Sequence, residues 1–447
     1  MKWTESQSKA IKLRGCNILV SAAAGSGKTA VVTQRAIDLI VNENVDISKI
    51  LMITFTEAAA LEMRSRLGGR LLDEISKGKD AKRLSGQLEK LNDSSISTVH
   101  AYCISLLRRH YHSADIDPNF TVLGEDAPDY QIRAVSKVLD EMFEEKDASF
   151  LTLCDTLGGR GGEGIQNIVL EIYAFARSQP EYMALINKWT EEFNLDENEI
   201  MHSSWAEFLK RMFLDNFKDM IVLASEALKL CRSDGGPASY IPAFESDLAY
   251  FNEALGILKS GNFEKAKEII SQGSFMTLPR KKKDDDASVV EMCKVLRDGT
   301  KDLNKKMQSS VIMLPTEEIT QRHKDMYGSI SALREVLERF DKEYKKIKKR
   351  RKQLDFEDLQ HLALEALKNE AVQDDEKQKF DYVFVDEYQD TNSLQESIIE
   401  KIISNNNLIC VGDVKQSIYA FRQADPTLFL KRRLISSENE GDQNRLI

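Results

Sequence analysis

The sequence predicts an α/β protein in which a parallel sheet is interrupted by a large helical insertion. Short apolar runs alternate with helical patterns over about the first hundred residues and again after Phe380, and this alternation is typical of βα units. Between these regions, stretches rich in Leu, Glu, Lys and Ala recur at helical spacing. We therefore expect one α/β domain built from residues 1–125 and 353–447, with residues 126–352 inserted as a helical sub-domain.

The elements of the expected sheet follow in order along the chain. Strands are predicted at residues 17–21, 50–55, 95–99, 382–385 and 408–411. Helices are expected to begin near Lys28 and Glu57, to end near Arg109, and to lie near residues 394–403. Apolar runs that alternate with helical patterns in this way predict a parallel sheet with crossover helices.

Composition excludes several classes of protein. The chain has 447 residues, of which 42% are hydrophobic and 30% charged, as in soluble globular proteins of roughly three domains or sub-domains. The net charge of −10 excludes a strongly basic domain, so any nucleic-acid binding must come from a local groove. Six scattered cysteines indicate neither a zinc site nor a disulfide framework. Without a long apolar run or a leader pattern, we expect a cytoplasmic protein that does not bind membranes.

The strongest chemical signal is Ser21-Ala-Ala-Ala-Gly-Ser-Gly-Lys-Thr29, which follows one predicted strand and opens a helix. Backbone N–H groups of such a loop surround phosphate oxygens, while its Lys reaches the β- and γ-phosphates and its Thr holds Mg²⁺. Ala22 stands where the strict pattern has its first Gly. The predicted ATP-binding residues of this P-loop are Ala22, Ala23, Ala24, Gly25, Ser26, Gly27, Lys28 and Thr29.

A second half-site follows the strand predicted at residues 382–385. That apolar run ends in Asp386 and Glu387. Asp386 is predicted to complete the Mg²⁺ shell together with Thr29, and Glu387 to orient and deprotonate the attacking water. Carboxylates after an apolar run are common, but their pairing with a P-loop predicts a nucleoside triphosphatase that uses ATP and Mg²⁺.

Six ordered blocks resemble the UvrD/Rep/RecB-like superfamily 1 DNA helicases. They are residues 4–7, 21–29, 54–64, 97–103, 386–390 and 411–422. Within that superfamily, the Ala-rich P-loop and residues 354–359 and 412–426 look most like AddA, the helicase–nuclease subunit of AddAB. The resemblance implies a RecA-like motor domain with a helical insertion, acting in double-strand break repair and recombination.

The resemblance also implies roles for individual residues. Gln7 resembles a glutamine that reads the adenine edge, although an exposed turn glutamine is the simpler interpretation. Gln416 resembles the residue that senses the γ-phosphate, so the implied catalytic set is Lys28, Glu387 and Gln416. Stacking on aromatic rings binds single strands without reading their sequence. The implied DNA contacts are Thr54, Phe55, Thr56, His100, Tyr102, Tyr419, Phe421 and Arg422.

The sequence departs from the family pattern in two respects. Ala30 stands where many relatives have the arginine that packs on adenine, and Arg35 is a weak substitute. The second motor domain and the nuclease domain do not follow Ile447, so we expect an N-terminal fragment that binds ATP but hydrolyses it poorly by itself. In the full-length protein, the resemblance implies 3′→5′ translocation with exonuclease activity. The implied partners are single-stranded and duplex-end DNA and an AddB-like subunit.

Three other functions fit parts of the pattern. A stand-alone UvrD-type repair helicase shares the same motor blocks, and an RNA helicase would use similar stacking and phosphate contacts. A non-motor module that uses ATP only as a switch on DNA or on a partner would not need Glu387. The basic run at residues 342–352, with eight Lys and Arg residues, is either a solvated helix face or a phosphate-contacting surface.

Overall fold

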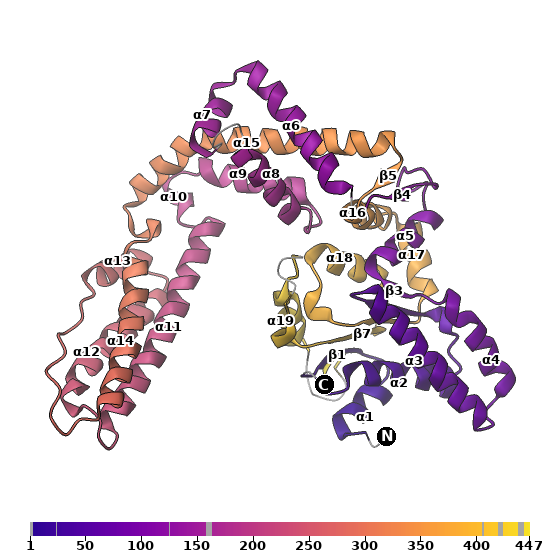
Figure 1. The fold of residues 1–447 in the computed structure, drawn as a ribbon, viewed down its shortest axis with the longest axis horizontal. Coiled ribbons are helices and arrows are strands. Elements are labelled where there is room, and N and C mark those ends of the chain that lie inside the picture. The colour runs from indigo at the N-terminus through magenta and orange to yellow at the C-terminus, as the bar shows by residue number, and fades with distance from the viewer. Residues whose placement is uncertain are drawn as a thin grey trace. The chain divides into compact units, whose positions relative to one another are not determined.

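The computed structural model describes residues 3–23, 25–124, 126–157, 163–404, 406–418, 423–436 and 442–447. Contacts divide the chain into two compact units. Unit 1 comprises Met1–Ile186 and Glu335–Ile447, and unit 2 comprises Asn187–Arg334. Unit 1 holds all of the strands found in the described residues, with helices around them (Figure 1). The α/β class with a parallel sheet, predicted from the sequence, is confirmed.

Unit 1 is built on a six-stranded sheet in the order β3-β2-β6-β7-β1-β8. Every pairing in this sheet is parallel. The strands are β1 (Asn17–Ser21), β2 (Ile50–Thr54), β3 (Ile96–Thr98), β6 (Tyr382–Val385), β7 (Leu408–Gly412) and β8 (Asn444–Leu446). Because β1, β6 and β7 are parallel neighbours, the carboxyl ends of strands from distant parts of the sequence lie side by side.

Helices cover both faces of this sheet because successive strand residues point to opposite sides. In β2, Leu51 and Ile53 belong to one apolar core, whereas Ile50 and Met52 belong to the other. The first core is completed by α5 (Val99–Arg109), α16 (Phe356–Ala366), α17 (Glu370–Lys379), α18 (Ser393–Ile402) and α19 (Pro426–Leu434). The second is completed by α1 (Glu5–Lys12), α2 (Lys28–Asn42), α3 (Glu57–Ser76) and α4 (Ala81–Lys90).

Unit 1 also holds a small parallel sheet of β4 (Thr121–Val122) and β5 (Gln353–Leu354) and a group of further helices. They are α6 (Ala127–Glu145), α7 (Ala148–Leu157), α8 (Glu163–Ala176), the start of α9 (Tyr182–Glu191) and the end of α15 (Thr316–Arg350). Tyr173 of α8 packs edge-on against Phe340 of α15, with ring centroids 4.8 Å apart. These aromatic contacts join α8 to the later half of α15.

In its described residues, unit 2 consists of helices and their connections, without a strand. Its helices are α10 (Glu197–Ile200), α11 (Ser204–Arg232), α12 (Ile241–Lys259), α13 (Phe263–Gln272), α14 (Ala287–Gln308), the end of α9 and the first part of α15. Phe213, Phe217 and Phe251 are fully buried in its main core. A buried ion pair, Arg297 Nε to Asp247 Oδ2 at 2.7 Å, fixes α14 to α12.

The contact-based units have different boundaries from the predicted domains. The described part of residues 127–350 is helical apart from its connections, as the change of pattern near residues 126 and 352 indicates. The boundary between the two units instead falls after Ile186 and before Glu335, because α6, α8 and the end of α15 make their contacts within unit 1. The predicted domain boundaries therefore remain an interpretation of the sequence. Among the described residues, no helix combines the length and apolar character needed to cross a membrane.

Candidate nucleotide and DNA site

The P-loop connects the end of β1 to the first turn of α2. Gly25 and Gly27 both have positive φ values, +74° and +84°, a conformation that glycine adopts without strain. Gly27 is the residue before α2, so the loop places free backbone N–H groups at a helix N-terminus. Ala22 N donates to Gly412 O at 3.1 Å and joins this loop to the end of β7. The loop therefore has the form of an anion-binding turn.

Gln7 contacts the P-loop directly. Its Nε2 donates to Ser26 O at 3.0 Å, and its Oε1 accepts from Thr4 N at 2.9 Å in the capping box of α1. The side chain is therefore held against the phosphate loop rather than free in a turn. Its contact with an adenine remains a prediction.

The three predicted catalytic residues meet at the carboxyl ends of the sheet strands. Lys28 Nζ donates to Gln416 Oε1 at 3.0 Å and lies 3.8 Å from Glu387 Oε2. The Lys28 side chain is only 9% exposed, whereas that of Glu387 is 40% exposed and accessible to water. Glu387 has a φ of +50°, which is uncommon for a residue with a side chain and is enriched at active sites. The chain thus brings a cation, an amide and a carboxylate from three distant segments together.

Asp386 and Thr29 supply the oxygen atoms predicted to hold Mg²⁺. Asp386 follows β6, and its N–H donates to Ile53 O at 2.9 Å, which fixes the turn. Burial, and then the neighbouring charge of Glu387, raises the pKa of the Asp386 carboxyl to about 6. A hydroxyl and a carboxylate are hard oxygen ligands of the kind that Mg²⁺ prefers. The donor set therefore fits this metal.

A cavity of about 570 Å³ opens beside the two carboxylates and holds predicted DNA contacts. Phe55 and His100 line it together with Phe356, which is not among the predicted DNA contacts. The rings of His100 and Phe356 meet edge to face with centroids 5.0 Å apart, and Phe356 is 46% exposed. Phe356 lies within residues 354–359, so the sequence signal for it was present.

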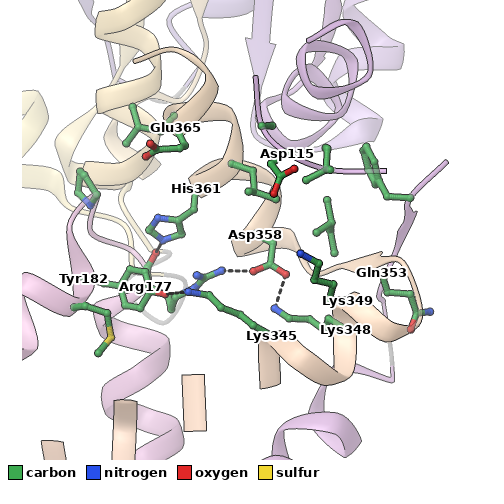
Figure 2. Close-up of a pocket in the computed structure, with 18 of the residues that line it drawn as sticks. Asp115, Arg177, Tyr182, Lys345, Lys348, Lys349, Gln353, Asp358, His361 and Glu365 are labelled. Carbon is green, nitrogen blue, oxygen red and sulfur yellow. Dashed lines mark hydrogen bonds and ion pairs between the residues drawn. The ribbon is translucent and has the colours of Figure 1, made fainter. Parts of the chain in front are cut away.

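A second cavity, of about 700 Å³, holds none of the predicted site residues. Figure 2 shows Asp358 between Arg177 and Lys348, with Arg177 Nη2 2.8 Å from Asp358 Oδ1. Lys348 is 2% exposed and bonds Asp355 at 2.6 Å as well as Asp358. This cavity lies on the opposite side of α16 from the first, since residues 358, 361 and 362 line it whereas residues 356, 357 and 360 line the first.

The basic run at residues 342–352 contributes mainly to this packing. Acidic or tyrosine side chains bond Lys345, Lys346, Lys348, Arg351 and Lys352. Within the described residues, the structure gives no ion pair for Lys342, Lys349 or Arg350. Most of the run is therefore accounted for by contacts inside the chain.

His361 provides a testable consequence of this charged cluster. Its Nε2 lies 2.9 Å from Arg177 O, and burial together with the charge of Arg177 lowers the pKa of the imidazole to about 3. Since the folded pKa is below the unfolded value of about 6.5, the stabilisation is complete above pH 6.5 and is lost as the pH falls toward 3. Between pH 7 and pH 5, the free energy of unfolding of the wild type should therefore fall by about 2 kcal/mol more than that of His361→Gln. Urea unfolding at the two pH values measures this difference, and parallel losses in both proteins would contradict it.

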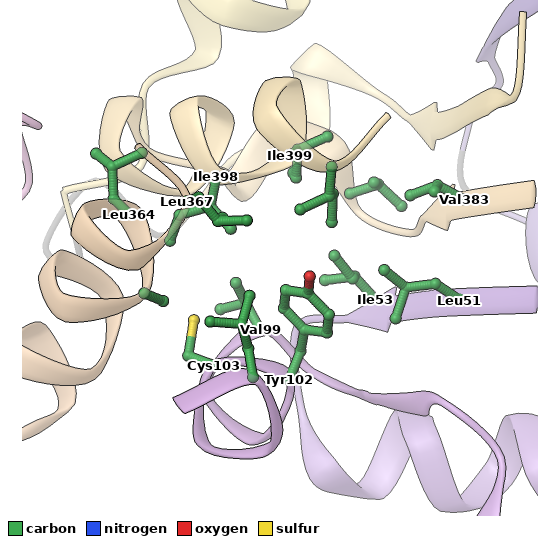
Figure 3. Close-up of a cluster of buried hydrophobic side chains, with 14 of the residues drawn as sticks. Leu51, Ile53, Val99, Tyr102, Cys103, Leu364, Leu367, Val383, Ile398 and Ile399 are labelled. Carbon is green, nitrogen blue, oxygen red and sulfur yellow. The ribbon is translucent and has the colours of Figure 1, made fainter. Parts of the chain in front are cut away.

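The structure corrects the prediction that Tyr102 contacts DNA. Tyr102 is 3% exposed and lies in the core among Leu51, Val99 and Cys103 (Figure 3). Its hydroxyl donates to the buried Glu376 at 2.8 Å. Because α5 turns this side chain toward the sheet, the ring has no free face for a base.

Two threonines of the predicted DNA set have structural roles in the present conformation. Thr54 is 2% exposed and its hydroxyl donates to Thr56 O, and it also lines the cavity beside Phe55, so its contact with DNA remains a prediction. Thr56 is exposed, and its hydroxyl accepts from Ala59 N as the N-cap of α3. Arg35 also cannot replace the missing adenine-stacking arginine, because it is 2% exposed and donates to Ala10 O.

Some predicted residues lie outside the part of the chain that the structure describes. They are Ala24 of the P-loop and Tyr419, Phe421 and Arg422 of the DNA set. Their assignments remain predictions.

Comparison with known proteins supports the relationship. The family model of the UvrD/REP helicase N-terminal domain matches residues 3–434. Three similar proteins are each named as the A-type subunit of an ATP-dependent helicase/nuclease. The chain is 37% identical to the protein from Alkaliphilus oremlandii, 35% identical to that from Syntrophomonas wolfei and 34% identical to that from Clostridium acetobutylicum. All of this chain is aligned in each case, but it spans only 37%, 36% and 38% of those proteins. The chain belongs to the family of the UvrD/REP helicase N-terminal domain.

Proposed function

We propose that this chain is the ATP-binding motor portion of an ATP-dependent 3′→5′ DNA helicase and nuclease subunit of the AddA type. The observation that carries the proposal is the meeting of Lys28, Gln416 and Glu387 at the carboxyl ends of the sheet strands, beside a cavity lined by the rings of Phe55, His100 and Phe356. The relatives named as ATP-dependent helicase/nuclease subunits support the same activity. The full-length protein would act on DNA ends in double-strand break repair, together with an AddB-like subunit.

Each residue of the site has a separate task in this proposal. The P-loop amides and Lys28 bind the phosphates, and Thr29 and Asp386 would hold Mg²⁺, which would supply positive charge against the phosphates. Glu387 accepts a proton from the attacking water, and its 40% exposed side chain leaves room for that water. Gln416 already bonds Lys28, so it is in reach of the γ-phosphate that Lys28 would contact.

The charge of the cavity indicates which part of DNA enters it. Asp386, Glu387, Asp390 and Glu357 line the cavity, and Phe55 and Phe356 supply uncharged rings. Phosphates would be repelled by these carboxylates, whereas bases stack on aromatic faces. We therefore propose that single-stranded DNA inserts bases here and keeps its phosphates outside.

The experiment that tests this function is the binding and hydrolysis of Mg·ATP by this chain, with and without a single-stranded oligonucleotide, in low-salt buffer. We expect nucleotide and DNA to bind with little turnover, because an arginine supplied from elsewhere accelerates this class of reaction by about 10³–10⁵. A chain that binds no nucleotide would contradict the proposal. DNA-stimulated turnover by the chain alone would show that its catalytic set is already complete.

Phe55 gives a more local test of the DNA cavity. Phe55→Ala should weaken oligonucleotide binding roughly 5- to 150-fold, because base stacking on an aromatic ring contributes about 1–3 kcal/mol. Mg·ATP affinity should not change, since Phe55 follows β2 whereas the P-loop follows β1, which is not a neighbour of β2 in the sheet. Fluorescence anisotropy of a labelled oligo(dT) measures the first quantity. Phe208→Ala, at a 64% exposed ring in unit 2, is the control, and equal effects of the two substitutions would exclude Phe55 from the site.

A further inference from the structure

Gln389 lies between the nucleotide site and the DNA cavity. It is 1% exposed, and its Nε2 donates to Glu387 Oε2 at 2.8 Å and to Asp390 Oδ2 at 3.1 Å. Its Oε1 accepts from Asp413 N at 2.9 Å. All of the amide's hydrogens are thus used, and one of its oxygen lone pairs. Reversing the amide would set its oxygen against two carboxylates, so only this orientation is satisfied.

These bonds complete a closed ring around the predicted catalytic residues. Asp413 Oδ2 accepts from Gln416 Nε2 at 2.6 Å, and Gln416 Oε1 accepts from Lys28. Lys28 in turn lies 3.8 Å from Glu387, which returns the ring to Gln389. Every residue in the ring therefore has its position fixed by two neighbours.

Gly412 shows how closely Gln389 is held. A Cβ atom at Gly412 would lie 2.3 Å from Gln389 Oε1, and 3.3 Å from its backbone N. The backbone φ at Gly412 is ordinary, so a side chain is excluded by this approach rather than by conformation. A hydrogen bond from Ser417 Oγ to Gln389 O, at 3.4 Å, adds a second contact with the segment after β7.

We propose that Gln389 is a positioning residue that couples the nucleotide site to the DNA cavity. Its single NH₂ group bonds both Glu387, which is placed to activate water, and Asp390, which is buried in the wall of the DNA cavity. The inference rests on the function proposed above and adds to it a residue through which the two sites act on each other.

The coupling follows from the rigidity of the amide. A γ-phosphate that attracts Lys28 and Gln416 would shift the Asp413 side chain that Gln416 bonds, and the backbone N–H of the same Asp413 bonds the amide of Gln389. The amide carries that movement to Asp390. By thermodynamic linkage, a base that displaces Asp390 changes the affinity for nucleotide by the same factor by which nucleotide changes the affinity for DNA.

The test measures this factor with the chain itself. The affinity for Mg·AMPPNP, a non-hydrolysable ATP analogue, is determined with and without saturating oligo(dT), and the reverse titration is performed as a check. We expect DNA to change nucleotide affinity by roughly fivefold or more in the wild-type chain. In Gln389→Met, which has a similar length but no amide, we expect each ligand still to bind and the change to fall below about twofold.

Gln87 offers a matched control. It is also a buried glutamine, whose Oε1 accepts from Ile47 N at 2.7 Å and whose Nε2 donates to Asp46 at 3.1 Å. Gln87→Met removes equivalent bonds between α4 and the segment before β2, so it should lower stability and keep the coupling. Gly412→Ala provides a second variant that displaces the amide without removing it, and it should also lose the coupling if Gln389→Met fails to fold.

The outcomes separate the inference from the proposed function. Loss of coupling in Gln389→Met, with coupling kept in Gln87→Met, supports the inference, and Gly412→Ala takes the place of Gln389→Met if that variant does not fold. Coupling of wild-type size in the variant so measured overturns the inference and leaves the proposed function intact, as does a wild-type chain that binds both ligands independently. A wild-type chain that binds neither ligand overturns both.

Discussion

Replacing Lys28 with alanine is expected to weaken Mg·ATP binding by this chain roughly 10- to 150-fold. A hydrogen bond to a charged group contributes about 1.5–3 kcal/mol, and each 1.4 kcal/mol is a factor of ten in affinity. The lysine is 9% exposed and is held by Gln416 at 3.0 Å, so its ammonium is directed into the site before any ligand binds. Removal of the lysine side chain therefore loses a phosphate contact that the free protein can make without first ordering that side chain.

The measurement is a titration of the chain with a fluorescent ATP analogue in the presence of Mg²⁺. Lys12→Ala is the control, because Lys12 is exposed on α1 and the P-loop bonds of that helix come from Gln7. DNA affinity should be unchanged in Lys28→Ala, since Lys28 is not among the residues that line the DNA cavity. Normal nucleotide affinity in Lys28→Ala would mean that the loop does not bind phosphate.

The sheet could be predicted because its strands are local apolar runs that end in residues of different chemistry. The run before the P-loop and the run before Asp386 have the predicted bounds, Asn17–Ser21 and Tyr382–Val385. A glycine-rich loop or a pair of carboxylates cannot continue a buried strand, because it cannot fill the apolar layer on either face. The sequence therefore marks both the strand and its end.

Three short strands could not be predicted in the same way. β8 is Asn-Arg-Leu, and it pairs with β1 at the edge of the sheet. β4 and β5 have two residues each and pair across the whole insertion. Such segments have no internal pattern, so their conformation is determined by a partner that is distant in sequence.

The site could be predicted where its functional residues are adjacent in the sequence. The P-loop and the carboxylates of Asp386 and Glu387 need particular residue types at fixed spacing, and the structure brings them together with Gln416. Tyr102 shows the limit, because an aromatic residue on a helix next to a strand serves the core as readily as a surface. Which face of α5 it occupies depends on packing against Glu376, and that contact is not local.

Gln389 shows a second limit. It stands between predicted site residues in the sequence, yet nothing in its residue type indicates that it is buried and bonded to both neighbours. Its role depends on Asp413 and Gly412 of the next strand, which approach it only after β6 and β7 pair. Positioning residues of this kind are determined by tertiary structure rather than by a motif.

Glu387→Gln is expected to abolish most ATP hydrolysis in the full-length protein while leaving ATP binding within about twofold of wild type. A glutamine has the same shape and keeps a side-chain oxygen that can accept from Gln389, as Glu387 Oε2 does at 2.8 Å. The positive φ of +50° at this position is unchanged by the substitution, so any strain is common to both proteins.

What the substitution removes is the carboxylate that takes the proton from water. General-base catalysis contributes about 10²–10⁴ to a rate, so phosphate release stimulated by oligo(dT) should fall by a similar factor. Glu365→Gln, at an exposed carboxylate of α16, should hydrolyse ATP normally. Because Lys28 lies 3.8 Å from Glu387, the substitution removes a negative charge that offsets the lysine and repels phosphate, so binding should not weaken. Hydrolysis by Glu387→Gln at the wild-type rate would show that another group activates the water, and would limit Glu387 to a structural place in the ring.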